Sequence, residues 1–274
     1  MSFLTVDQDK CKRDRICADE CPAKLIVFKE TDSFPDAVKR AELYCIRCGH
    51  CVAVCPSNAI SVSTVSSVDC LPVDPGLLPT ADQVEHLLKS RRSIRGFKNK
   101  AVDRAALEKL IETSSYAPSG HNTQPVHWLV IEDVNKVNRI AAIVVDWMRY
   151  MIDNKPEFAA SMAMKALCYA WDHGDDRICR NAPHIIIAHA PKDMLSSPGS
   201  CTIALSYLEL AAHSMGIGAC WAGFVGMAAA TFPPLIEELA LPEGHKAFGA
   251  MMIGYPKHSY HKIPPRTAAR IIWR

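Results

Sequence analysis

The residues best suited to chemistry are cysteines near the start of the chain. A run of Cys-x2-Cys-x2-Cys-x3-Cys-Pro extends from Cys45 to Pro56 without a gap. Thiolates at this spacing are ligands of iron–sulfur clusters, and such clusters transfer electrons one at a time. The run therefore predicts a redox module.

The stretch from Cys11 to Pro22 repeats this run at a constant offset of 34 residues, with Asp14 in the place of Cys48. A carboxylate is a harder ligand than a thiolate and holds iron less firmly. The fourth cysteine of such a run ligates the other cluster of the pair. The pattern therefore predicts one cluster on Cys21, Cys45, Cys48 and Cys51, and a second on Cys11, Asp14, Cys17 and Cys55.

Two questions stay open for these ligands. Either Asp14 or a water molecule completes the second set. Paired cysteines also serve structural zinc, although zinc sites normally use two pairs separated by a long loop. Because the later run holds four sulfurs in eleven residues and ends in proline, we favour clusters.

The composition of the chain restricts its environment and partners. It has 274 residues, enough for roughly two domains, and a formal net charge of +2. This charge does not predict nucleic-acid binding, which needs a strongly basic face. Twelve cysteines without a secretory signal at the start indicate metal ligation and a cytoplasmic location. The uncharged stretch 210–236 is long enough to span a membrane, but its glycines and prolines favour a buried helix end and a cofactor loop.

The chain divides into a cysteine module at residues 1–65, a proline-containing linker at 66–80 and a larger domain at 81–274. In the larger domain, Thr80 and Gln83 predict a capping box at the start of a helix, and another helix is expected after Asp103. Hydrophobic patterns predict strands at 127–133, 184–190 and 247–255, and helices at 134–152, 161–171 and 203–215. The larger domain is therefore expected to mix helices and strands.

A second set of chemically suited residues begins with RRSIRGF at 91–97. Guanidinium groups match phosphate oxygens in pairs, so this run predicts a phosphorylated cofactor, although a solvated basic helix end would have the same composition. The loop YAPSGHNTQPVHW at 116–128 then offers hydrogen-bonding groups suited to the edge of a heteroaromatic ring, from Ser119, Asn122 and Gln124.

These motifs give the chain two family resemblances. The cysteine module resembles a bacterial two-cluster ferredoxin, in which a cluster beside aspartate holds three or four irons. Residues 85–274 resemble the nitroreductase family in the RRSIR run, APSGHNTQP, GIGACWAGF and the PPR tail. The resemblances imply an α+β fold, with a small ferredoxin module followed by an α/β sandwich around a central, mostly antiparallel sheet. They also imply FMN bound at a homodimer interface.

The nitroreductase resemblance also implies roles for residues of the larger domain. Arg91, Arg92, Ser93 and Arg95 would hold the phosphate, ribityl chain and pyrimidine edge of FMN. Pro118, Ser119 and Asn122 would reach the flavin from the partner subunit. The loop with Ala222 and Gly223 would present N–H groups near the ring, and Arg266 would bind phosphate. Some relatives have glutamate at the position of Ala222 and lysine near Pro264, so substrate contacts there do not transfer.

The expected function is reduction of a small planar electrophile, of the nitroaromatic or quinone type, by FMN that receives electrons from the clusters. No protein nucleophile or acid–base pair is needed, and none is predicted. The electron donor is left open between an external ferredoxin and NAD(P)H. Two alternatives remain: a redox sensor or carrier that uses the labile cluster, and another reaction of the same fold, such as dehalogenation, ene reduction or flavin breakdown.

Overall fold

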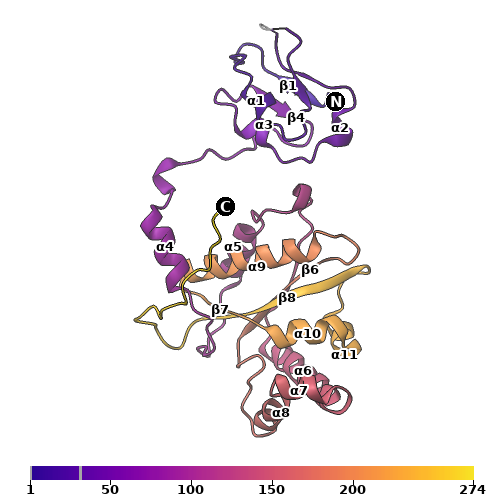
Figure 1. Ribbon diagram of the computed structural model, residues 1–274, viewed down its shortest axis with the longest axis vertical. Coiled ribbons are helices and arrows are strands. Elements are labelled where there is room, and N and C mark those ends of the chain that lie inside the picture. Colours follow the sequence, from indigo (N-terminus) through magenta and orange to yellow (C-terminus); the bar gives the residue numbers. More distant parts are fainter. Residues whose placement is uncertain (1, 31–32) are drawn as a thin grey trace. The chain divides into compact units, whose positions relative to one another are not determined.

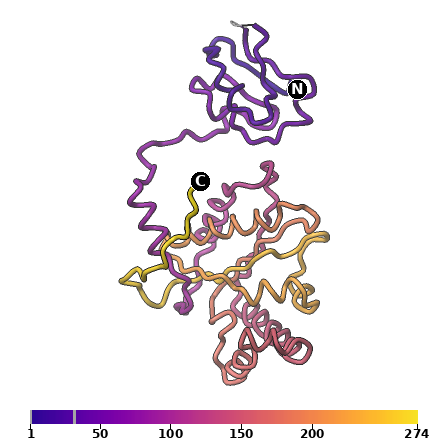
Figure 2. The backbone as a smooth tube through the Cα atoms, in the orientation of Figure 1, coloured from indigo at the N-terminus to yellow at the C-terminus, as the bar shows by residue number. Residues whose placement is uncertain are grey.

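The computed structural model describes residues 2–30 and 33–274. Its contacts divide the chain into two compact units, which are shown in Figures 1 and 2. The first unit extends to Leu78 and includes His121–Thr123, and the second comprises Pro79–Gly120 and Gln124–Arg274. Each unit is described by itself below.

The first unit contains two copies of one backbone motif. Helix α1 (Ile16–Asp19) and helix α3 (His50–Ala53) are separated by the same 34 residues as the cysteine runs. The residues before them, Arg15 and Gly49, are both left-handed, with φ of 68° and 71°. The repeat predicted from the cysteines therefore extends to the path of the backbone.

Short strands and cysteine side chains complete the first unit. Strand β1 (Leu4–Val6) pairs antiparallel with β4 (Ile60–Val62), and β2 (Ile26–Val27) pairs with β3 (Asp36–Ala37). Helix α2 (Ala41–Tyr44) lies between the two cysteine runs in sequence. The two small clusters of buried residues each include a cysteine predicted to bind iron. With so small an apolar core, metal binding is expected to contribute directly to folding of this unit.

The second unit is built on a four-stranded antiparallel sheet. Its strands are β5 (His127–Ile131), β6 (His184–Pro191), β8 (His245–Gly254) and β7 (Gly218–Trp221), in that spatial order. Strand β6 is buried on both faces, because Ile185 and Ile187 contribute to one hydrophobic cluster and Ile186 to the other. The expected central antiparallel sheet is confirmed.

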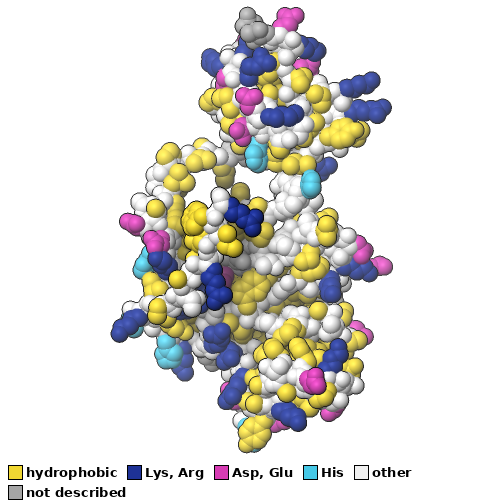
Figure 3. All heavy atoms as spheres, viewed as in Figure 1, with side chains coloured by type: hydrophobic (Ala, Val, Ile, Leu, Met, Phe, Trp, Pro, Cys, Tyr) yellow, Lys and Arg dark blue, Asp and Glu magenta, His cyan; other side chains and the backbone are white. Residues whose placement is uncertain are grey.

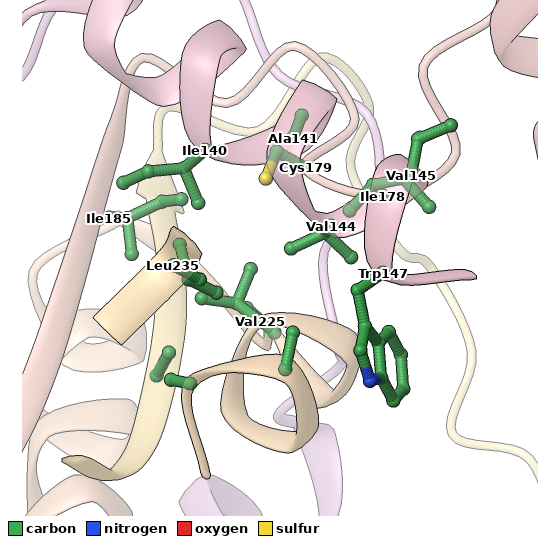
Figure 4. Packing of buried hydrophobic residues seen from close by; sticks show 14 of the residues in the cluster. Ile140, Ala141, Val144, Val145, Trp147, Ile178, Cys179, Ile185, Val225 and Leu235 are labelled. Carbon is green, nitrogen blue, oxygen red and sulfur yellow. The ribbon is translucent and has the colours of Figure 1, made fainter. Parts of the chain in front are cut away.

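Helices cover both faces of this sheet (Figure 1). On one face lie α5 (Arg104–Ser114) and α9 (Ser197–Ser214). The other face is covered by α6 (Val134–Asn154), α7 (Pro156–Ser161), α8 (Met164–Asp172), α10 (Gly223–Thr231) and α11 (Pro233–Leu239). Figure 4 shows Trp147 of α6, Val225 of α10 and Leu235 of α11 in this second layer. The α+β fold class is thereby confirmed.

Several predicted boundaries hold in the second unit. Helix α4 (Ala81–Ser90) begins with the expected capping box. The Gln83 N–H donates to Thr80 Oγ1 at 3.3 Å, and the Thr80 N–H donates to Gln83 Oε1 at 2.8 Å. Short 3₁₀ turns lie at Pro75–Leu77 in the first unit and at Gly120–Asn122, which includes residues of both units. After Gly254 the chain continues to its end without a helix or a named strand, as the yellow trace in Figure 2 shows.

Two expectations differ from the structure. The helix predicted at 161–171 corresponds to α8, which begins three residues later, at Met164, because Ala163 has a left-handed φ of 51°. Gly216 ends α9 with a left-handed φ of 69°, as expected for a glycine after a helix. The stretch that follows, 217–236, was predicted to be a loop, but most of it forms β7, α10 and α11. Among residues 2–30 and 33–274, no helix is both long and apolar enough to cross a membrane.

Candidate functional site

Four cysteines of the first unit surround one cavity. They come from both runs, since Cys21 belongs to the earlier run and the other three to the later one: Cys45, Cys48 and Cys51. The remaining walls are mainly apolar and include Phe3, Leu25 and Val62. The grouping matches the first ligand set predicted from the spacing.

The other predicted set is also gathered in space. Burial, together with negative charge on Asp14, Cys11 and Cys55, raises the pKa of the Cys17 thiol to about 11. The pKa of Cys51 is likewise raised to about 11. Burial is the main cause, and the negative charges of the cysteines that share its cavity are the second. A bound metal reverses this balance, because a coordinating thiol is deprotonated by the cation.

Backbone N–H groups are directed at the cysteine sulfurs. The Leu25 N–H donates to Cys21 Sγ at 3.3 Å, and the Ala59 N–H donates to Cys55 Sγ at the same distance. The donors and the acceptors of these two hydrogen bonds are each separated by 34 residues, as the cysteine runs are. Hydrogen bonds to sulfur help to set the reduction potential of an iron–sulfur cluster. The two halves of the module thus provide matching environments for the cysteines that precede Pro22 and Pro56.

Asp14 is the position at which the two halves differ. Its side chain is exposed, and Oδ1 accepts a hydrogen bond of 3.3 Å from the Ile16 N–H. Within the described ranges, no three His, Cys, Asp or Glu side chains are placed to bind a single metal ion. The four cysteines around the cavity are thiolate ligands of the kind that hold iron–sulfur clusters.

A cavity of the second unit lies beside the predicted phosphate-binding run. This cavity has a volume of about 920 Å³, and Arg91, Arg92 and Ile94 form part of its wall. The run lies against strand β7, because the Ile94 N–H donates to the Ala219 carbonyl at 2.9 Å. A Cβ at Gly218 would lie 2.8 Å from Ile94 Cγ2, so this close approach requires glycine.

Charged and polar side chains of α9 also line this cavity. Arg91 Nη1 donates to Glu209 Oε1 at 2.7 Å, and Ser90 Oγ lies 2.9 Å from His213 Nε2. Burial lowers the pKa of His213, and the positive charges of Arg91, His86 and Arg92 lower it further. Glu209 and His213 were not predicted as site residues. Their spacing of four residues on a helix could have indicated that they share a face.

The cofactor-binding residues predicted on the loop at 116–128 lie elsewhere in the structure. Pro118, Ser119 and Gln124 line a separate cavity of about 130 Å³, where Ser119 Oγ accepts a 2.9 Å hydrogen bond from the Gln124 N–H. Asn122 belongs to the first unit, and its side-chain amide donates to the carbonyl of Arg47 at 2.9 Å. The structure therefore does not bring Asn122 into the cavity that holds its predicted neighbours.

The remaining predicted residues do not line the 920 Å³ cavity: Ser93, Arg95, Ala222, Gly223 and Arg266. The Ala222 N–H donates to the Ala250 carbonyl at 2.8 Å. Gly223 begins α10, where N–H groups have no acceptor within the helix. Of the two N–H groups expected near a flavin ring, that of Gly223 is therefore better suited to a ligand.

Comparison with known proteins gives matches for both units. Residues 88–255 match the Nitroreductase family, and residues 9–60 match the 4Fe-4S dicluster domain. The FMN reductase [NAD(P)H] of Bacillus subtilis is 26% identical over 188 residues, which are 67% of this chain and 70% of that protein. An Archaeoglobus fulgidus protein with the provisional name NADH dehydrogenase/NAD(P)H nitroreductase is 27% identical over 171 residues, 62% of this chain and 84% of that protein.

A solved structure agrees with the fold of the second unit. The FMN-bound nitroreductase of Bacteroides fragilis superposes with a TM-score of 0.57 at 20% identity, covering 70% of this chain and 99% of that chain. The similarity supports the shared fold, while the two matched regions confirm the fusion expected from the motifs.

Proposed function

Because the chain belongs to the Nitroreductase family and also carries a 4Fe-4S dicluster domain, we propose that it is an FMN-dependent oxidoreductase supplied with electrons by its own clusters. The substrate is a small planar electrophile of the nitroaromatic or quinone type. The observation that carries this proposal is the convergence of four cysteines from two separate runs on one cavity, in a chain with a nitroreductase domain.

The cysteines divide between two clusters according to the grouping in the first unit. Cys21, Cys45, Cys48 and Cys51 hold a [4Fe–4S] cluster with thiolate ligands alone. The second cluster lies on Cys11, Asp14, Cys17 and Cys55, and it has either three or four irons. The N–H groups of Leu25 and Ala59 stabilise the negative charge on the sulfurs of Cys21 and Cys55.

The 920 Å³ cavity is the FMN site proposed for the second unit. Its size falls within the range of about 300–1,000 Å³ that is typical of ligand pockets. Arg92 provides positive charge for the phosphate, and Glu209 fixes the position of Arg91. FMN supplies a centre that accepts electrons singly and delivers them to a substrate in pairs. The arginines and the cavity wall bind and orient it.

A homodimer would complete this site. Pro118, Ser119 and Gln124 line a cavity other than the one that contains Arg91 and Arg92. This separation supports a role for the loop at the FMN site of a second subunit. The arrangement follows the expectation from the family and is part of the proposal.

The test begins with anaerobic purification, followed by measurement of iron, sulfide and FMN per chain. The protein is then reduced with ferredoxin, NADH or NADPH in separate experiments, and its absorbance is followed at the flavin and cluster bands. We expect flavin reduction after cluster reduction, followed by turnover with a quinone or a nitroaromatic compound. Cys48→Ser should slow the ferredoxin-dependent reaction strongly.

Cys70→Ser is the matched control, because Cys70 is exposed and lies outside both runs. This variant should retain normal iron content and turnover. Flavin that stays oxidised beside fully reduced clusters would contradict the proposed relay and favour a sensor or carrier. Turnover that removes halide or cleaves the flavin, without reduction of quinones or nitroaromatics, would contradict the proposed substrate class.

A further inference from the structure

Three histidines lie together on neighbouring strands of the second unit, away from the cysteine runs in sequence. His127 on β5 is the direct cross-strand partner of His189 on β6. His245 on β8 pairs with Pro191, two residues beyond His189. Side chains two positions apart on a strand lie on the same face. The register therefore brings the three imidazoles together at one end of the sheet.

This histidine cluster, formed by His127, His189 and His245, continues an apolar face of the sheet. Ile187 precedes His189 by two residues, and Ala247 follows His245 by two, and both belong to the same hydrophobic cluster. His189 is buried, with 5% of its surface exposed. His245 is half-buried and His127 is exposed. The face thus changes from apolar to nitrogen-rich where it reaches solvent.

The spacing of the rings resembles that of imidazoles around one metal ion. The three ring centroids are separated by 4.8, 5.1 and 5.5 Å. With about 2.1 Å from zinc to nitrogen and about 1.1 Å more to the ring centre, tetrahedral ligation separates ring centres by roughly 5 Å. The Nδ1 atoms of His189 and His245 share a hydrogen bond of 3.0 Å, which a bound ion would replace, and this distance is close to the roughly 3.3 Å between two nitrogen ligands of one such ion.

We propose that the histidine cluster binds a divalent transition-metal ion of the zinc class, through His127, His189 and His245. As the rings are now oriented, the described parts of the chain contain no group of three side chains that meets the geometry of a bound ion. The His127 ring stands at 87° to that of His245, and its side chain is exposed, so binding requires this ring to rotate toward the two Nδ1 atoms. The fourth ligand position is left to water.

Imidazole binds a metal ion in its neutral form, so binding at this site should weaken as the pH falls. Imidazole nitrogen is a ligand shared by zinc, copper, iron and nickel, so the proposal specifies the class of ion and leaves its identity to measurement.

The test is equilibrium dialysis of the complete protein, with clusters and flavin in place, against Zn²⁺ under anaerobic conditions. Zinc and iron are both counted, so that replacement of cluster iron is recognised. We expect one zinc per chain without loss of iron. His127→Gln should weaken binding by at least about tenfold, because it removes one of three ligands without disturbing the buried core.

His173→Gln is the matched control, since His173 is an exposed histidine on a different element. It should bind zinc as the unaltered protein does. His189→Gln should also lose binding, and tryptophan fluorescence would verify that this variant is folded. The proposal is overturned if the complete protein binds no zinc beyond any that replaces iron, or if His127→Gln and His173→Gln bind it equally.

Discussion

Arg91 and Glu209 form an ion pair that joins the predicted phosphate-binding run to helix α9, with Nη1 and Oε1 2.7 Å apart. Their side chains retain 21% and 12% of their exposed surface, so the pair is largely shielded from solvent. The carboxylate neutralises the guanidinium that the sequence suggested for phosphate. Arg91 is therefore better described as a residue that fixes the run, which leaves Arg92 as the more available cation.

Glu209→Gln should destabilise the second unit by about 1–2 kcal/mol, because it leaves Arg91 without its charged partner in a half-buried position. Urea unfolding followed by tryptophan fluorescence measures this effect, since all five tryptophans belong to the second unit. The control is Glu85→Gln, which removes an exposed ion pair with Lys89 and should leave stability unchanged. Equal unfolding midpoints for the two variants would contradict the role given to Glu209.

The exchange of cysteines between runs predicts a crossed pattern of cluster loss. Cys21→Ser should disturb the all-thiolate cluster, although Cys21 lies in the run that contains Asp14, and should leave the other cluster present. Cys55→Ser should do the reverse. Iron analysis with electron paramagnetic resonance of the reduced and oxidised proteins distinguishes the two outcomes, and each variant serves as the control for the other. If each substitution instead disturbs the cluster of its own run, the interlocked arrangement is wrong.

The sequence predicted the elements of the second unit well where one pattern dominates. Strand β6 contains an uninterrupted apolar run at 185–188, and the Thr80 capping box is a local signal that needs no distant partner. The start of α8 after Ala163 was missed because nothing in an alanine predicts a left-handed backbone. Its conformation depends on the packing of α7 and α8 rather than on its own preference.

The candidate sites likewise include features that the sequence predicts locally and features that depend on the fold. The cysteine grouping followed from a repeat and a ligand rule, so it could be predicted from spacing alone. The pairing of Arg91 with Glu209 joins residues 118 positions apart, and the histidine cluster depends on strand order and register. Neither the ion pair nor the histidine cluster has a local sequence motif, because each forms only when distant segments of the chain come together.

Asp14→Cys should convert the second cluster to four thiolate ligands and make its iron harder to remove, because thiolate suits iron in such clusters better than carboxylate does. The measurements are the rate of iron loss to a chelator and the magnetic signal of the oxidised protein. Lys12→Cys is the control, since it adds an exposed cysteine two residues away without occupying the ligand position. Iron loss and signal that are unchanged in Asp14→Cys would show that residue 14 does not influence the cluster.

His184 should make the stability of the second unit depend on pH. Burial lowers the pKa of this histidine, although the negative charge of Glu132 opposes the shift, and the ring accepts a 2.8 Å hydrogen bond from the Val102 N–H at Nε2. The unfolded protein therefore binds a proton more readily than the folded one, so stability present above about pH 6.5 is lost as the pH falls. The urea midpoint, followed by tryptophan fluorescence, should decrease from pH 7 to pH 5.

His184→Gln keeps a hydrogen-bond acceptor but does not titrate, so its urea midpoint should decrease less over this pH range. The exposed His173→Gln should show the same decrease as the unaltered protein. An equal decrease in all three proteins would exclude His184 as a source of the pH dependence.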